Sequence, residues 1–202
     1  MTARTEAFSD AIFAIAMTLL VLEIKPPSGD ADLLPALAHQ WPSLLAFVVS
    51  FMYIGIYWMN HHAGFNRLQR VDGWLLLLNL LFLATISFVA YPTALLAERL
   101  ASGRELNVAV AFYGVAMFLP AATGVWTFSY GVRTPGLLAP DVDRARVAAS
   151  QRYNILGPLI YAISIPFALV LPIAALTFYV VAPVFFAIVA ARDRTWSVGS
   201  RG

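Results

Sequence analysis

Long apolar stretches dominate the hydrophobic pattern of this chain. Four of them contain no Asp, Glu, Lys or Arg, and they cover residues 33–66, 73–97, 106–132 and 153–191. A helix that crosses the hydrocarbon core of a bilayer needs about 20 mostly apolar residues, so each stretch can cross once and the last can cross twice. A shorter apolar run follows Asp10, and a helix that includes its polar start also reaches that length. The pattern predicts an all-α integral membrane protein.

Prolines mark where these spans begin and end. Pro26 and Pro27 would end the first span, and Pro42 occupies a favoured first-turn position in the second. Pro172, after Leu171, would separate the last two. We therefore predict a single domain, residues 1–202, with spans at about residues 5–24, 42–62, 73–97, 106–130, 153–171 and 173–191.

The basic residues are divided unevenly between the two sides of these spans, ten against three. The larger group is Arg4, Arg67, Arg70, Arg133, Arg144, Arg146, Arg152, Arg192, Arg194 and Arg201, and the smaller is Lys25, Arg99 and Arg104. Cytoplasmic loops carry an excess of Lys and Arg, so both termini are predicted to be cytoplasmic. The acidic start, Glu6 and Asp10, argues against a cleaved signal peptide, which begins with basic residues. We expect a multi-pass protein of the cell membrane, with the lipid bilayer as its surroundings.

Composition supports the membrane assignment and removes several kinds of chemistry. Of the 202 residues, 60% are hydrophobic and 12% charged, whereas a soluble domain carries about 25% charged residues. The absence of cysteine excludes disulfides, iron–sulfur clusters and thiolate nucleophiles. A net charge of +2 does not favour nucleic acid binding. Clustered carboxylates and phosphate-binding glycine loops are missing too, so we expect neither an enzyme nor a cofactor.

Polar residues gather at the start of the first span, in the run Arg4-Thr5-Glu6-Ala7-Phe8-Ser9-Asp10. Charged groups at membrane depth usually mark a pathway or a paired site. Arg4 and Phe8 are four residues apart and share a helix face, whereas Asp10 points elsewhere. We therefore expect Asp10 to find its partner on another helix. The alternative is an ordinary helix start, with Ser9 or Asp10 as the N-cap.

A second polar cluster, Trp58-Met59-Asn60-His61-His62, lies at the end of the second span. Neighbouring helical residues point about 100° apart, so the two histidines cannot face one ion together and no metal site is expected. Both clusters lie at the cytoplasmic end of their spans. We therefore predict that Asn60 and one histidine hydrogen-bond to the group formed by Arg4, Ser9 and Asp10. The alternative is that the histidines are simply interfacial.

The rest of the first span carries a stripe of side chains on one face. At about 100° per residue, Thr18, Leu19 and Leu22 lie within about 60° of Ile15. From these residues alone, the stripe is a face for lipid or for helix packing.

Together, these residues resemble the transmembrane protein 175 family, the endosomal and lysosomal potassium channels and their prokaryotic relatives. Arg4, Phe8, Ser9 and Asp10 match the family's RxxxFSD signature, and the match continues to Ile24. The Trp58–His62 segment resembles the family's second helix. Six spans correspond to one family repeat, so the resemblance is to the single-repeat prokaryotic type.

The resemblance implies a potassium-preferring cation channel that assembles as a homotetramer. Four copies of the first helix would line a central pore, with Ile15 at the constriction and Leu19 and Leu22 as further apolar rings. Thr18 would offer hydroxyl oxygens to the potassium ion. Residues of the two polar clusters would form a network that holds the pore helix in place. They are Arg4, Phe8, Ser9, Asp10, Trp58, Asn60 and His61.

A secondary transporter is the main alternative function. Transporters use broken helices around a midplane site, and Pro158, Pro166, Pro172 and Pro183 would provide breaks. Against this, none of the predicted spans has an ionisable residue at mid-depth, where proton or substrate coupling would need one. A purely structural role stays open at this stage.

Overall fold

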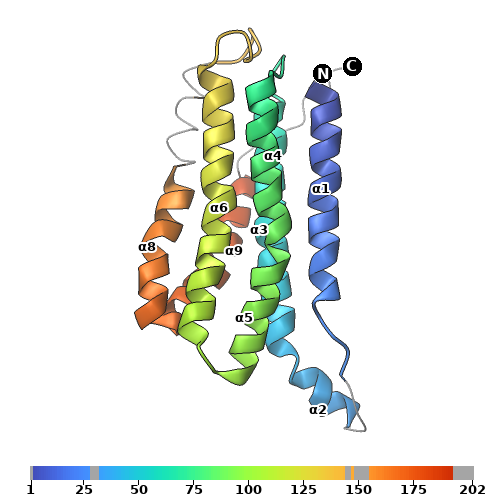
Figure 1. Ribbon diagram of the computed structural model, residues 1–202, viewed down its shortest axis with the longest axis vertical. Coiled ribbons are helices and arrows are strands. Elements are labelled where there is room, and N and C mark those ends of the chain that lie inside the picture. Colours follow the sequence, from blue (N-terminus) through green and yellow to red (C-terminus); the bar gives the residue numbers. More distant parts are fainter. Residues whose placement is uncertain (1, 28–31, 144–146, 148–154, 193–202) are drawn as a thin grey trace.

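Long helices run side by side between two ends of the molecule in the computed structural model (Figure 1). The structure describes residues 2–27, 32–143, 147 and 155–192, the last eight as backbone only. The helices are α1 (Thr2–Leu22), α2 (Leu33–Ala38), α3 (Trp41–Phe65), α4 (Gly73–Phe88), α5 (Ala90–Ser102), α6 (Leu106–Arg133), α8 (Leu156–Val170) and α9 (Pro172–Arg192). Each of the six apolar segments expected from the sequence is therefore helical.

Four of the described helical units are long and apolar enough to cross a membrane: α1, α3, α4 together with α5, and α6. In α8 and α9 the described apolar segments, Leu156–Val170 and Pro172–Val184, are shorter. The first two residues of the predicted fifth span, 153 and 154, lie outside the described part of the chain.

The first helix starts earlier than predicted. It begins at Thr2 instead of residue 5 and ends at Leu22 instead of residue 24. Ser9 and Asp10 therefore lie well inside the helix, and the interpretation of either residue as an N-cap is wrong. At the other end, Glu23 and Ile24 donate backbone hydrogen bonds to Leu20 and Val21, which tightens the last turn before Pro26.

The predicted third span is two helices, α4 and α5, that meet at Val89. Pro92 accounts for the break: it has no backbone N–H, and its ring conflicts with the carbonyl four residues earlier, at Phe88. The helical segment then continues past residue 97 to Ser102, where Gly103 ends it with a positive φ of 69°.

The separation between the last two spans is confirmed at Leu171, between α8 and α9. Leu171 has left the helical conformation, with φ −127° and ψ 65°, and its N–H still donates to the Phe167 carbonyl at 2.7 Å. Pro172 then opens α9. At this junction the chain reverses direction, and α9 runs back toward the end of the bundle from which α8 came (Figure 1).

Positive charge is divided between the two ends of the bundle as the sequence predicted. The start of α1 and the ends of α3 and α6 lie at one end, and α2 and the turn from α5 to α6 lie at the other (Figure 1). The first end carries Arg4, Arg67, Arg70 and Arg133, and the second carries Lys25, Arg99 and Arg104. Arg192 is the last residue of α9 and is described as backbone only, and Arg144, Arg146, Arg152, Arg194 and Arg201 lie outside the described residues.

Tight packing and buried hydrogen bonds hold the bundle together. Lipid provides no hydrophobic drive for helices to associate, so contacts and interhelical hydrogen bonds must stabilise them. Phe13, Phe82 and Met117 are among the fully buried side chains at the centre. Around them, Ser50 bonds both Thr93, at 2.8 Å, and Tyr113, at 2.9 Å, and so joins α3, α5 and α6.

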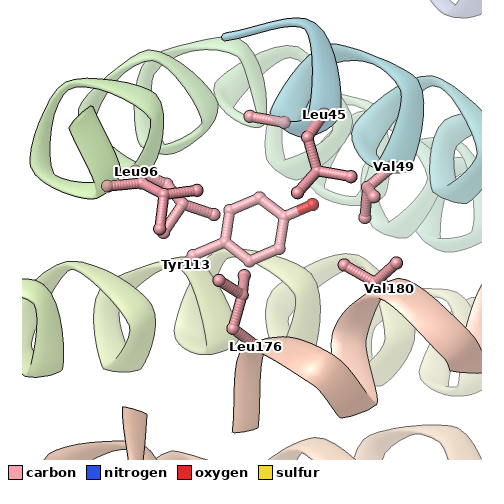
Figure 2. Close-up of a pocket in the computed structure, with 8 residues that line it drawn as sticks. Leu45, Val49, Leu96, Tyr113, Leu176 and Val180 are labelled. Carbon is pink, nitrogen blue, oxygen red and sulfur yellow. The ribbon is translucent and has the colours of Figure 1, made fainter. Parts of the chain in front are cut away.

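Tyr113 also closes the interior of the bundle. Its ring lies among apolar side chains of α3, α5 and α9, including Leu45, Val49, Leu96 and Val180 (Figure 2). The cavity between them has a volume of only about 10 Å³, which is the room that a single water requires, and apolar cavities stay dry. This part of the protomer interior offers no path to a hydrated ion.

Candidate functional site

The first helix has one buried and one exposed face. Ser9, Phe13, Ala16 and Leu20 are buried against α3 and α4. These positions recur every three or four residues, which places them on one side of a helix. α1 itself lies at the edge of the bundle (Figure 1). Its opposite side is therefore exposed.

The exposed face of α1, which we call the α1 stripe, contains the predicted constriction residues. Ile15 is 57% exposed, Leu19 40% and Leu22 70%. The complete stripe consists of Arg4, Ala7, Phe8, Ala11, Ala14, Ile15, Thr18, Leu19 and Leu22. A large apolar face of this kind is covered either by lipid or by another protein surface.

Thr18 is the polar member of the stripe nearest to Ile15. Its hydroxyl donates to the Ile15 carbonyl at 2.9 Å, within the same helix. Because this bond uses the proton, the lone pairs of the oxygen stay available as acceptors. The side chain can therefore present oxygen, but no competing hydrogen, to a cation near the stripe.

Behind the stripe, a chain of hydrogen bonds joins α1 to α4 and α3. The Ser9 hydroxyl donates to the Thr5 carbonyl at 2.8 Å, and Asn79 Nδ2 donates to Ser9 Oγ at 3.0 Å. The Asn79 amide oxygen then accepts from His61 Nε2 at 2.9 Å. Ser9, His61 and Asn79 are all buried. We call these three residues the buried relay.

The directions of these bonds define the state of His61. Asn79 must turn its oxygen toward the imidazole because its nitrogen donates to Ser9. Nε2 of His61 therefore carries a proton, while the buried Nδ1 has no hydrogen-bond partner among the described residues. Aromatic rings surround the imidazole, with Phe65 stacked at 4.4 Å and Phe82 at 5.7 Å between centroids. His61 is thus locked in place by packing as well as by Asn79.

Two further contacts connect α1 to α3 on a more exposed side. Trp58 Nε1 donates to Asp10 Oδ1 at 2.9 Å, and His62 Nδ1 lies 2.9 Å from Glu6 Oε1. The Trp58 and His62 rings stack on each other, 6.0 Å between centroids. The expectation that Asp10 finds a partner on another helix is thereby confirmed.

Not every predicted network residue joins these contacts. The structure brings Ser9, Asp10, Trp58 and His61 together through direct bonds or through Asn79. Arg4, Phe8 and Asn60 are instead exposed, and within the part of the chain described here their side chains make no hydrogen bond or ion pair. Among the described residues neither predicted bond to the group of Arg4, Ser9 and Asp10 is direct: Asn60 makes none, and His61 reaches Ser9 only through Asn79.

Two further residues belong to this site, although they were not among the predicted network residues. Asn79 is the amide that links Ser9 to His61, and Glu6 is the partner of His62. An asparagine in the middle of an otherwise apolar span is itself a signal, because a polar group in hydrocarbon must be paired. Hydropathy shows that Asn79 needs a partner but not which helix provides it.

The described side chains give the site little capacity for metal chemistry. No group of three or more His, Asp or Glu residues gathers in the described parts of the chain. What the arrangement provides is a helix with one side packed against the bundle and hydrogen-bonded to it, and one exposed, mostly apolar side. Such a helix can line a passage while the buried relay fixes its rotation.

Comparison with known proteins gives a consistent result. Residues 4–89 match the model of a family described as the endosomal/lysosomal potassium channel TMEM175. The chain is 44% identical over 169 residues to a potassium channel of Streptomyces collinus, an alignment that covers 83% of this chain and 82% of that protein. It is 38% identical over 168 residues to a potassium channel of Chamaesiphon minutus, with 81% and 82% covered.

The fold matches a solved structure over nearly its whole length. This is the crystal structure of a lysosomal potassium-selective channel TMEM175 homolog from Chamaesiphon minutus, with a TM-score of 0.84 and 34% sequence identity. The match covers 93% of this chain and 96% of that chain.

Proposed function

The chain belongs to the TMEM175 family, and we propose that it is a potassium channel whose ion path is lined by α1. Relatives that align over most of their length are named potassium channels and not enzymes. The observation that carries the proposal is the α1 stripe, since a helix at the edge of the bundle exposes Ile15, Leu19 and Leu22. Passive conduction of potassium is therefore the function that we assign.

The path would run between protomers, along the axis of a homotetramer. Around Tyr113 the protomer is closed by apolar side chains and has only a small, dry cavity. Four copies of α1 that face one axis would cover the stripe and create a continuous passage. Arg4, Phe8 and Asn60, which lack partners within the described protomer, would then be available to neighbouring copies.

An apolar ring explains how such a passage closes. Four Ile15 side chains give a cation no ligands, and a narrow apolar constriction blocks ions by losing its water. Leu19 and Leu22 would add further rings on the outward side. Opening requires that α1 tilts or rotates until the constriction widens and fills with water, and Thr18, one turn away, would then offer oxygen to a partly dehydrated potassium ion.

The hydrogen bonds behind α1 would determine its rotation. The buried relay and the bond from Trp58 to Asp10 hold the side of the helix that faces away from the stripe. Because a helix is stiff, fixing one side also fixes where Ile15 points. Conduction would thus depend indirectly on the residues that fix the position of α1, which are Ser9, Asp10, Trp58 and His61.

The membrane arrangement that fits this function has six spans in one domain, residues 1–202, as in the single-repeat prokaryotic members of the family. Both termini would be cytoplasmic, on the side that carries Arg4, Arg67 and Arg133. α8 and α9 would supply the last two spans, and the protein would lie in the cell membrane.

Flux through liposomes tests this function. The purified protein should release potassium rapidly and passively, and Ile15→Asn should raise the flux because a polar ring holds its water. Ile163→Asn is the matched control: Ile163 on α8 is 61% exposed, close to the 57% of Ile15, but does not belong to the α1 stripe. This control should leave the flux unchanged.

Two results would contradict the proposal. Equal effects of Ile15→Asn and Ile163→Asn would mean that α1 does not line the path. Slow, saturable exchange with a fixed stoichiometry would indicate a secondary transporter instead of a channel.

A further inference from the structure

The contact between Glu6 and His62 lies outside the buried relay and has no role in the function described so far. His62 Nδ1 is 2.9 Å from Glu6 Oε1, with the His62 side chain 41% exposed and Glu6 21%. On its other side, His62 Nε2 lies 3.0 Å from Asn66 Nδ2. The imidazole therefore bridges the start of α1 and the end of α3 with both ring nitrogens engaged.

This contact is one step of a regular ladder between two antiparallel helices. Glu6 and Asp10 are four residues apart on α1, and their partners His62 and Trp58 are four residues apart on α3. Residues with that spacing share a helix face. The stacking of Trp58 on His62 joins the two steps, so neither helix can rotate without disturbing both contacts.

We propose that Glu6 and His62 are positioning residues that make the orientation of the pore helix sensitive to proton concentration at the cytoplasmic end. The inference rests on the function proposed above. In the neutral imidazole, Nδ1–H donates to Glu6 and Nε2 accepts from Asn66, so every group is satisfied. In the protonated form the Glu6 contact becomes an ion pair, and Nε2–H requires Asn66 to turn its amide oxygen inward. The two states therefore hold α1 against α3 with different strength.

Three other titratable groups on α1, α3 and α4 have their own partners, whereas Arg4, two residues before Glu6 on α1, is exposed and has none among the described residues. On α1, Asp10 accepts from Trp58. On α3, the neighbouring His61 is buried and donates to Asn79. At the start of α4, Asp72 accepts from the Leu75 N–H and from the Tyr130 hydroxyl. Glu6 is thus the carboxylate paired with His62 among the described residues.

Potassium flux at about pH 5.5 and pH 8 on the cytoplasmic face tests the proposal in four variants: Glu6→Gln, His62→Gln, the double variant and His39→Gln. Glutamine keeps a hydrogen bond at either position but removes the charge. We expect the flux of the unaltered protein to change by about two- to five-fold between the two pH values, the effect that one partly exposed ion pair provides. Each single variant should lose most of this change, and the double variant should lose no more.

His39→Gln is the matched control, because His39 lies at the end of α2, at the other end of the bundle. Among the described residues its ring bonds the Pro35 carbonyl of its own helix. It should keep the pH response. A pH response that survives Glu6→Gln and His62→Gln, or a flux of the unaltered protein that does not depend on pH, would overturn the proposal.

A second measurement separates this proposal from the proposed function. If no variant conducts, the channel assignment fails, but the contact can still be measured through the unfolding midpoint in detergent. The midpoint difference between the protein and His62→Gln should be larger at about pH 5.5 than at about pH 8. A difference that is the same at both pH values would show that the contact carries no proton sensitivity.

Discussion

At the scale of single residues, the side-chain amide of Asn79 is the central hydrogen-bonding group of the buried relay. Its amide accepts from His61 and donates to Ser9, and so connects three helices inside an apolar environment. An amide in this position cannot be replaced by an apolar side chain of similar size without leaving a neighbour unpaired. The cost of one unpaired buried donor, about 1–3 kcal/mol, exceeds the net worth of an ordinary hydrogen bond.

We therefore expect Asn79→Leu to lower the free energy of unfolding by about 1–3 kcal/mol, because the His61 Nε2–H loses its acceptor. Unfolding in detergent, followed by circular dichroism, measures this change. Asn60→Leu is the control, since Asn60 is exposed on α3, and in the isolated protomer it should shift the value by less than about 0.5 kcal/mol. Equal effects of the two substitutions would contradict the role given to Asn79.

At the scale of helices, the positions of glycine residues decide how closely α3 can pack against its neighbours. Two glycines on α3, Gly55 and Gly64, face different neighbours. A Cβ at Gly64 would collide with the Phe128 ring of α6, whereas a Cβ at Gly55 would have Met17 of α1 as its nearest neighbour, at 3.8 Å. The α3–α6 contact therefore requires a glycine, and the α1–α3 contact does not.

Gly64→Ala should destabilise the bundle by about 1–2 kcal/mol, because overpacking against Phe128 outweighs the gain in helix propensity. Gly55→Ala should be neutral or stabilising by up to about 1 kcal/mol. The unfolding midpoints of the two variants in detergent test both statements, and a more stable Gly64→Ala would show that Phe128 moves aside without cost.

At the scale of the whole molecule, the exposed face of α1 and the divided charge determine how the protein sits in its membrane and where ions would pass. Both features can be probed with single cysteines, because the chain has no native cysteine.

Ile15→Cys should react with a small, water-soluble thiol reagent when the channel conducts, whereas Ala16→Cys should not. The side chains differ because Ile15 is 57% exposed and Ala16, the next residue, is 3% exposed against the bundle. Labelling in liposomes, quantified by mass spectrometry, distinguishes them. Faster reaction at position 16 would mean that the other face of α1 lines the path.

Ser102→Cys and Pro135→Cys test the orientation in the membrane. Both positions are exposed: Ser102 is the last residue of α5, and Pro135 comes two residues after α6. The ends of these two helices lie at opposite ends of the bundle (Figure 1). In intact cells a reagent that cannot cross the membrane should label position 102, and label position 135 only after permeabilisation, because the side rich in arginine faces the cytoplasm. The reverse result would invert the topology.

Much of this architecture could be predicted from the sequence alone. Apolar stretches, prolines and the distribution of Lys and Arg determined the helical segments, the separation at Leu171 and the division of charge, because bilayer thickness and helix geometry act on each segment separately. The stripe of Ile15, Thr18, Leu19 and Leu22 also followed from one helix, because residue spacing decides which side chains share a face.

Only the tertiary structure decided which side chains meet. The bond from His61 to Asn79 and the contacts of Glu6 and Asp10 with α3 depend on how helices far apart in the sequence are rotated and aligned. Hydropathy carries no information about relative rotation, since a polar residue in an apolar span can be satisfied by any neighbouring helix. Packing selects one of these neighbours, and that choice presents the stripe to the outside of the bundle.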